Sequence, residues 1–251
     1  MKDKIWLWAH KEGLQNNRWG LTKESRISPF DACKYLGTEN VIFVREFGKP
    51  EPSEYEKYAE SFIPLKKVIW SIVGAGCTYE EGEIERIIEL KKKYKNIKGA
   101  IMDDFFITEK PPFTPEEIVD IKEKLNKNGL ELWTVLYQHQ LNLPVKEHLE
   151  KFDLITYWIW CSEGINELEK CFDIFCKIIP DRKKTLGIYM WDYGNNKEMP
   201  IELFKKECEI GLKWLKEDRI ENIIFLASCI VDLGLETVEY VKRLISDACR
   251  I

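Results

Sequence analysis

Short apolar segments recur along the chain, and each is followed by a longer segment with helical periodicity. An apolar run of about four to eight residues, bounded by turn-forming residues, is typical of a buried strand. The runs that fit this description span residues 5–9, 40–44, 68–73, 99–102, 132–137, 154–159, 185–190 and 223–227. The pattern therefore predicts eight strands with helices between them.

Capping residues predict where the intervening helices begin and end. Ser28-Pro29 opens a helix that Gly37 follows, with proline near the start and glycine just past the end. Thr114-Pro115-Glu116-Glu117 has the form of a capping box, and Asn128-Gly129 closes that helix. Thr78-Tyr79-Glu80-Glu81 repeats the box and is expected to open another helix. Further helices are expected over residues 53–62, 144–151, 166–179, 200–217 and 236–249.

Eight strands alternating with eight helices are the pattern of a (β/α)8 barrel, because each parallel strand pair needs a crossover helix that covers the sheet. We therefore predict an α/β fold of this class, a TIM barrel, with residues 1–251 as a single domain. An open doubly wound sheet is disfavoured, since its glycine fingerprint is missing: Gly74-Ala75-Gly76 lacks the third glycine.

The charge composition makes some classes of binding partner less probable than others. Lys and Arg number 38 against 43 Asp and Glu, and the net charge of -5 disfavours nucleic acid and anionic membranes. The apolar run near the start is too short for a signal peptide, and no run approaches the roughly 18 residues of a membrane span, so a cytoplasmic protein is expected. The eight cysteines, Cys249 included, show no zinc-ligand spacing and are expected to be buried thiols. The oligomeric state stays open.

Function in a barrel of this kind is sought at the carboxyl ends of the strands and in the loops that follow them. Aromatic and polar side chains gather there in this chain, which has nine Trp, ten Tyr and twelve Phe. Sugars stack on aromatic rings and need rigidly held polar partners. The candidate substrate-binding residues are therefore His10, Arg45, Tyr137, His139, Tyr157, Trp160, Tyr189, Trp191 and Tyr193. The mid-strand Trp6 and Trp133 are expected to be core.

Four carboxyls are candidates for catalysis. Asp103 and Asp104 end an otherwise apolar strand, where packing does not explain two acids. Side chains alternate along a strand, so only one of the two is expected to point into the barrel mouth, with Asp104 favoured. Asp192, between Trp191 and Tyr193, suits a general acid, because an apolar wall would raise its pKa. Glu46 follows Arg45, which would keep it ionised if the two pair.

Three loops on this rim are expected to shape the site. The segment Lys11–Lys23 is long for a connection between a strand and a helix, and long ordered loops on this rim tend to be functional. The segments Ile107–Phe113, which contains Lys110, and Gly194–Pro200 are expected to complete the site.

The strand that runs into Met102-Asp103-Asp104-Phe105-Phe106, with the aromatic ends of the sixth and seventh strands, resembles the glycosidase superfamily of TIM barrels. The resemblance covers the whole chain as architecture and implies a carbohydrate substrate, a pair of catalytic carboxylates and no cofactor or metal. Several of these families carry a catalytic carboxylate at the end of strand four, where Asp103 and Asp104 stand. The large clan with Glu after strands four and seven is not matched, since both positions hold Asp, and the DxxDxDxE pattern of chitinase-like barrels is absent.

Two other functions stay open on the sequence. A metal-dependent hydrolase or isomerase would need several ligands around one ion, for which Glu46, Asp103 and Asp104 are the available carboxylates. A noncatalytic barrel that binds carbohydrate would use the same aromatic residues without the acids.

Overall fold

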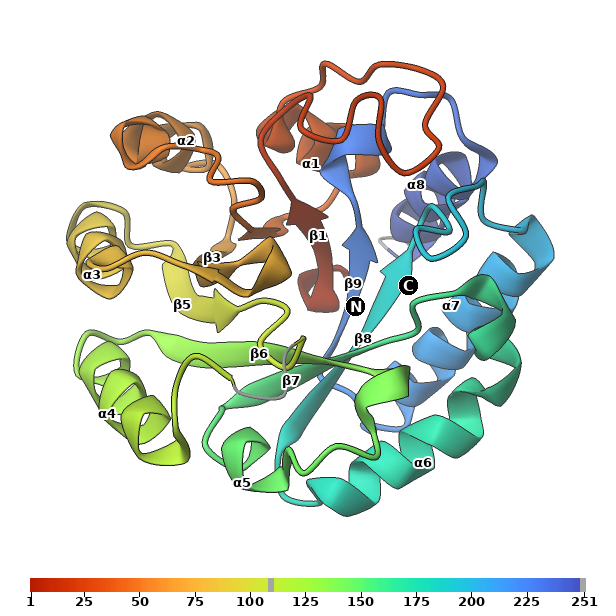
Figure 1. Cartoon of the computed structure of the whole chain (residues 1–251). Helices are drawn as coiled ribbons and strands as arrows, with labels where there is room; N and C mark the ends of the chain where they lie inside the picture. Colours follow the sequence, from red (N-terminus) through yellow and green to blue (C-terminus); the bar gives the residue numbers. More distant parts are fainter. Residues whose placement is uncertain (108–110, 249–251) are drawn as a thin grey trace.

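The computed structural model describes residues 1–107 and 111–248, and within them the strands form one closed parallel barrel. The prediction of a (β/α)8 barrel is confirmed, as Figure 1 shows. The barrel strands are β1 Ile5–Ala9, β2 Asn40–Phe43, β3 Lys67–Gly74, β5 Ile97–Met102, β6 Glu131–Tyr137, β7 Leu154–Trp158, β8 Lys183–Tyr189 and β9 Asn222–Leu226.

The barrel closes because the first strand pairs with both the second and the last. Leu7 of β1 lies opposite Val41 of β2 on one side and Phe225 of β9 on the other. The remaining strands follow in chain order, and β2 pairs with β3 in parallel. Closure leaves the parallel strands without a free edge and brings all their carboxyl ends to one rim.

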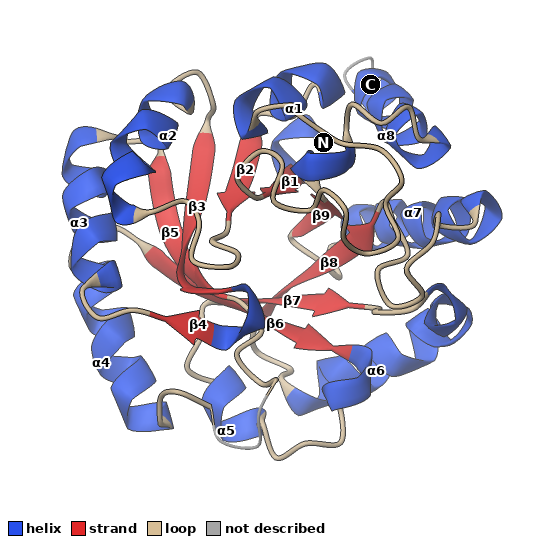
Figure 2. Cartoon of the chain, turned by 45° about the horizontal axis from the view of Figure 1, so that its top comes forward, coloured by secondary structure: helices blue, strands red, loops and turns tan. Residues whose placement is uncertain are grey.

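Helices surround the barrel in Figure 2 and cover the outward faces of the strands. Within the described residues they are α1 Pro29–Leu36, α2 Tyr55–Ser61, α3 Glu83–Lys93, α4 Pro115–Asn126, α5 Lys146–Leu149, α6 Leu168–Ile178, α7 Ile201–Lys216 and α8 Glu236–Ala248. Ser28 caps α1 by accepting from the Asp31 amide, and Gly37 ends that helix with a φ of 82°. The capping box at Thr114 is present as predicted.

The helix start predicted at Thr78 is wrong. Thr78–Tyr79 forms β4, a short strand antiparallel to the end of β3, and α3 begins only at Glu83 after Gly82. The reason is the turn that follows β3, because it folds the chain back onto that strand. The Thr78 hydroxyl then donates to the Ala75 carbonyl oxygen and caps no helix.

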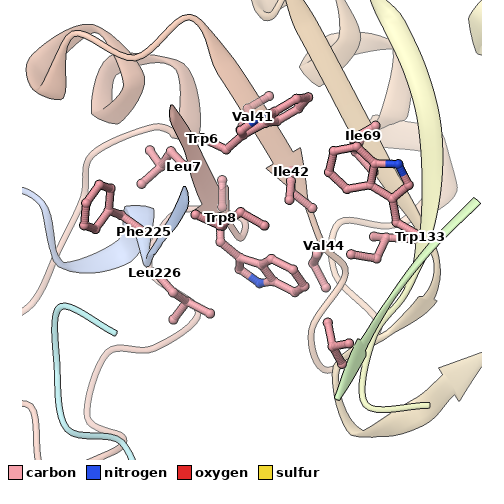
Figure 3. Packing of buried hydrophobic residues seen from close by; sticks show 14 of the residues in the cluster. Trp6, Leu7, Trp8, Val41, Ile42, Val44, Ile69, Trp133, Phe225 and Leu226 are labelled. Carbon is pink, nitrogen blue, oxygen red and sulfur yellow. The ribbon is translucent and has the colours of Figure 1, made fainter. Parts of the chain in front are cut away.

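The interior of the barrel is filled by large apolar side chains from the strands, some of which Figure 3 shows. Trp6 and Trp133 are buried with their ring centroids 5.2 Å apart, so the prediction that they are core is confirmed. Among the described cysteines, Cys33, Cys208 and Cys229 are buried and four are half-buried; Cys249 lies outside the described residues. No helix in the described part of the chain is long and apolar enough to span a membrane.

Candidate active-site cavity

A cavity of about 610 Å³ opens at the carboxyl ends of the barrel strands. Its lining residues belong to the last positions of these strands or to the loops directly after them. They are Trp8, His10, Gln15, Arg18, Trp19, Glu46, Phe47, Ala75, Gly76, Asp103, Asp104, Ile107, Tyr137, His139, Gln140, Trp158, Trp160, Tyr189, Tyr193 and Leu226. Aromatic rings therefore form much of the wall, and the three carboxyls share one space.

The structure brings most of the predicted site residues to this cavity. Those that line it are Glu46, Asp103, Asp104, His10, Tyr137, His139, Trp160, Tyr189 and Tyr193. Four predicted residues do not line it: Arg45, Tyr157, Trp191 and Asp192. The loop expected to shape the site contributes Gln15, Arg18 and Trp19. Of the loop after β5, Ile107 lines the cavity, and Lys110 lies outside the described residues.

Asp103 and Asp104 both line the cavity, so the expectation that only one of them would reach the barrel mouth is wrong. Strict alternation holds only while the backbone is extended, and Asp104 has a φ of 49°. The chain turns at that residue. The Asp104 carboxyl accepts from the Gly76 amide at 2.7 Å and from the Tyr137 hydroxyl at 2.8 Å.

Asp103 is the carboxyl whose protonation the site controls most strongly. Its side chain is buried, and its one hydrogen bond among the described residues is accepted from the Asp104 amide at 2.9 Å. Burial raises the pKa of Asp103 well above its usual value, and the negative charges of Asp104 and Glu46 raise it further. The neutral form of Asp103 is therefore favoured.

Glu46 and His10 lie together on another part of the wall. The distance from His10 Nδ1 to Glu46 Oε2 is 3.7 Å, whereas Nδ1 is 3.0 Å from the Val44 carbonyl oxygen. A proton on Nδ1 can donate to that carbonyl oxygen. The buried Glu46 Oε2 accepts no hydrogen bond from the residues the structure describes. The Glu46 carboxyl therefore lies in the cavity wall beside the His10 ring.

Five rings form a continuous aromatic wall. Trp160 lies edge-on to Tyr137 at 6.0 Å, to Tyr189 at 5.7 Å and to Trp19 at 6.0 Å, and Trp19 contacts Tyr193 at 5.8 Å. Burial raises the pKa of the Tyr137, Tyr189 and Tyr193 hydroxyls, so all three stay protonated. The wall therefore offers flat apolar faces with hydroxyl groups at its edges.

His139 stacks on Tyr137 at 5.5 Å beside this wall. Burial lowers its pKa, although the charge of Asp104 acts in the opposite direction. The imidazole is therefore favoured in the neutral form, in which one nitrogen donates and the other accepts a hydrogen bond.

Arg45 lies beneath the loop that carries Glu46. Its guanidinium pairs with Glu83 at 3.1 Å and with Glu80 at 2.9 Å. It also donates to the backbone oxygens of Gly48 at 3.1 Å and of Pro50 at 3.2 Å. These bonds tie the turn after β2 to the start of α3, so Arg45 positions Glu46 from outside the cavity.

Asp192 organises the loop after β8. Its carboxylate is fully buried and accepts from the Ser162 amide at 3.4 Å, from the Asn195 amide at 3.3 Å and from Asn195 Nδ2 at 2.9 Å. Donors from its own loop and from the loop after β7 therefore occupy both oxygens. This geometry places Asp192 in a loop junction outside the cavity lining.

Trp191 and Tyr193 connect the same loop to the one after β1. The Trp191 indole donates to the Trp19 carbonyl oxygen at 2.8 Å, and the Tyr193 hydroxyl donates to Gln15 Oε1 at 2.7 Å. The first bond places Trp191 behind Trp19, whose own ring faces the cavity. Trp191 therefore supports the aromatic wall from outside.

Tyr157 points away from the cavity because it alternates with Trp158 along β7. Its ring packs on Phe175 at 5.0 Å and Phe172 at 5.7 Å, both from α6, whereas Trp158 lines the cavity. Strand parity, applied to these two neighbours, is the signal in the sequence that would have chosen Trp158.

A metal site is not assembled by the side chains described. No group of three or more His, Cys, Asp and Glu within residues 1–107 and 111–248 has an arrangement that could hold an ion. Glu46, Asp103 and Asp104 share the cavity without converging on one point in this way.

Comparison with known proteins finds relatives at the level of structure only. No family model and no curated protein matches the sequence. A thermostable chitinase domain from Pyrococcus furiosus, solved with chito-oligosaccharides, is similar over 98% of this chain and 96% of that one, with a TM-score of 0.62 and 11% identity. The chain has the TIM-barrel fold. Its neighbours include glycoside hydrolases, and at this identity the likeness concerns the fold alone.

Two further neighbours differ in what their names describe. A xylanase–α-amylase inhibitor protein, solved in complex with trehalose, covers 97% of this chain and 98% of its own at a TM-score of 0.58 and 16% identity. A glycoside hydrolase family 17 β-1,3-glucanosyltransferase from Rhizomucor miehei covers 88% and 86% at a TM-score of 0.57 and 11% identity. An inhibitor and enzymes thus share this architecture, so function has to be argued from the site.

Proposed function

We propose that the protein is a glycoside hydrolase in which Asp103 is the general acid and Glu46 the second catalytic carboxylate. The observation that carries the proposal is the buried Asp103 carboxyl, whose pKa burial raises, in an aromatic-walled cavity that also contains Glu46 and Asp104. Glycosidases need one carboxyl protonated and another ionised on either side of the bond that breaks.

Each part of the site has a task in this reaction. A sugar ring stacks on the wall formed by Trp19, Trp160 and Tyr193, and tyrosine hydroxyls bond its hydroxyl groups. Asp103 delivers its proton to the glycosidic oxygen as the bond to the sugar carbon breaks. The positive charge that develops on the sugar is stabilised by Glu46, which then acts on the sugar carbon directly or through water.

Asp104 supports Asp103 in this scheme. Its carboxylate is oriented by Tyr137 and the Gly76 amide, and its charge helps keep the Asp103 proton in place. The substrate-binding role proposed here falls to His10, Tyr137, His139, Trp160, Tyr189 and Tyr193, which line the cavity.

A carbohydrate-binding barrel without catalysis is the second candidate. Asp104 has both oxygens engaged inside the protein, which suits a structural role, and one structural neighbour is named as an inhibitor that was solved with trehalose. This candidate uses the same aromatic wall and differs in that bound glycan would be released intact.

The test is a screen of purified protein against oligosaccharides and aryl glycosides, with binding and product release measured on each. We expect turnover of at least one glycan, and Asp103→Asn is expected to lower kcat about 100- to 10,000-fold while the glycan still binds. Glu46→Gln is expected to lower kcat similarly. Asp120→Asn, which changes an exposed carboxyl on α4, is the matched control and leaves kcat unchanged.

Two results would contradict the proposal. A glycan that binds and is never cleaved favours the carbohydrate-binding barrel. If the Asp103→Asn variant still cleaves the glycan at the original rate, Asp103 is not the general acid.

A further inference from the structure

Arg18 is the one basic side chain, of Lys and Arg, among the described residues that line the cavity. Its guanidinium carbon lies 4.0 Å from the centroid of the Phe47 ring. Within residues 1–107 and 111–248 the guanidinium makes no hydrogen bond and no ion pair, although three carboxyls line the same cavity. Stacking on a ring occupies the face of a guanidinium and leaves the N–H donors at its edge available.

Phe47 is held outward by its backbone. Its side chain is 51% exposed, and its φ of 52° lies in the left-handed region that a phenylalanine rarely adopts. Glu46 and Lys49 exchange two backbone hydrogen bonds of 2.9 Å around it, and Arg45 bonds the Gly48 oxygen from below. Both the exposure of the ring and the positive φ are energetically unfavourable, and the surrounding hydrogen bonds hold the turn in this conformation.

The loop that carries Arg18 is braced as well. Asn16 donates to the Ser25 carbonyl oxygen at 3.0 Å and accepts from the Ser25 amide at 2.8 Å. Gln15 accepts from Tyr193 and Trp19 accepts from Trp191, on either side of Arg18. The guanidinium is therefore presented at the cavity edge by a backbone fixed before and after it, which lowers the entropic cost of binding a ligand there.

The cavity lining thus carries charged side chains of both signs. Carboxyls lie at the strand ends, and a guanidinium that pairs with none of them lies on the loop above. A neutral sugar needs no cation at this place, whereas a carboxylate would accept two parallel N–H donors from the guanidinium edge.

We propose that the substrate is an anionic glycan and that Arg18, stacked on Phe47, binds the acidic group, a uronic-acid carboxylate, while the sugar ring lies against the aromatic wall. This inference rests on the proposed function for the location of the site. It adds the chemical class of the substrate and assigns Arg18 and Phe47 as specificity residues.

Binding is measured on Asp103→Asn protein, which keeps the cavity and prevents turnover from complicating the affinities. The ligands are trisaccharides of glucuronic or galacturonic acid, the neutral glucose or galactose trisaccharides of the same linkage, and the sulfated neutral sugars. We expect an acidic ligand to bind about 10- to 100-fold more tightly than its neutral counterpart, as is typical of a charged hydrogen-bonded pair. The preference is expected to shrink as salt is raised.

Variants of Arg18 test whether this residue causes the preference for acidic ligands. Arg18→Gln is expected to abolish the preference for acidic ligands and to leave the affinity for neutral sugars unchanged. Arg18→Lys is expected to keep only part of that preference, since an ammonium cannot bind a carboxylate bidentately. Arg26→Gln is the matched control, because Arg26 belongs to the same loop, is exposed and does not line the cavity. It leaves the preference intact.

The outcomes separate this inference from the proposed function. Tighter binding of a sulfated sugar than of a uronate overturns the assignment of a uronic-acid carboxylate and assigns a sulfate group to Arg18 instead. Equal affinity for acidic and neutral sugars, or loss of both alike in Arg18→Gln, overturns the inference even if neutral glycans are cleaved. A clear acidic preference without any turnover by the unsubstituted protein upholds it and rejects hydrolysis.

Discussion

Asp103 and Asp192 follow barrel strands, lie among aromatic residues and are buried, yet the fold uses them differently. Asp103 comes directly after β5, lines the cavity and accepts one hydrogen bond among the described residues. Asp192 comes three residues after β8, lies outside the cavity lining and accepts from two amides and a side-chain nitrogen. A buried carboxylate supplied with three donors serves structure, whereas one with few donors and charged neighbours is suited to proton transfer.

The comparison also separates two kinds of strand end. After β5 the chain turns at once, at Asp104, and both acids remain over the barrel. After β8 the chain forms a tight loop in which Asp192 pairs with Lys197 through the backbone. The first arrangement exposes carboxyls to a ligand, and the second encloses a carboxyl within its own loop.

The largest effect that tests this difference is on stability. Asp192→Ala leaves the amides of Ser162 and Asn195 without their acceptor, so the free energy of unfolding is expected to fall by about 2–3 kcal/mol. Asp103→Asn replaces a neutral acid by a neutral amide and is expected to cost less than about 1 kcal/mol. Urea unfolding at pH 7 measures both. Equal losses for the two variants would remove the distinction between a structural and a reactive carboxyl.

The pH dependence of stability sharpens the comparison further. Because the pKa of Asp103 is higher in the folded than in the unfolded chain, the folded state binds the proton more tightly. The contribution of this residue to stability is therefore fully present below about pH 4 and is lost as pH rises towards the folded pKa. The free energy of unfolding is expected to change with pH, because of Asp103, by at most about 1.4 kcal/mol per pH unit.

Asp103→Asn is expected to flatten this part of the stability profile, in urea unfolding from pH 4 to pH 8. Asp120→Asn, at an exposed position of α4, is the control and keeps the original slope. A profile that Asp103→Asn leaves unchanged would show that Asp103 is ionised in the folded protein across this range.

The smallest effect concerns the loop contact behind the aromatic wall. Trp191→Phe removes the hydrogen bond to the Trp19 carbonyl oxygen, worth about 1 kcal/mol, and loosens the ring that faces the cavity. We expect KM for a cleaved glycan to rise several-fold with little change in kcat. Trp214→Phe is the control, because this buried indole nitrogen has no hydrogen-bond partner among the described residues. It lowers stability and leaves KM unchanged, so the same KM change in both variants would contradict a positioning role for Trp191.

Much of the fold was readable from local patterns. Each predicted strand overlaps an observed one, and the first, Ile5–Ala9, matches at both ends. Capping chemistry predicted the helices that begin after Ser28 and Thr114, because those side chains bond backbone amides three residues away. The same motif failed at Thr78, where pairing with β3 outweighed the local preference.

The site was predictable only in part. Strand ends identified carboxyls and rings that share the cavity, since all carboxyl ends of a parallel barrel meet at one rim. The direction of a side chain beyond the strand was not predictable, as Trp191 shows, whereas alternation within β7 would have assigned Tyr157 to the outer face. The position of Arg45 at a strand end predicts a substrate contact, but Arg45 forms ion pairs with Glu80 and Glu83, which lie more than thirty positions away in the sequence.

By itself, then, the sequence determined the order of strands and helices and the rim at which chemistry gathers, because periodicity and capping act over a few residues. Only the tertiary structure decided which of the gathered side chains share a cavity. Trp191 reaches the backbone of Trp19 across 172 positions, and Asp104 turns inward through one backbone angle. Such choices depend on contacts between loops that meet only after the barrel has closed, so no local pattern encodes them.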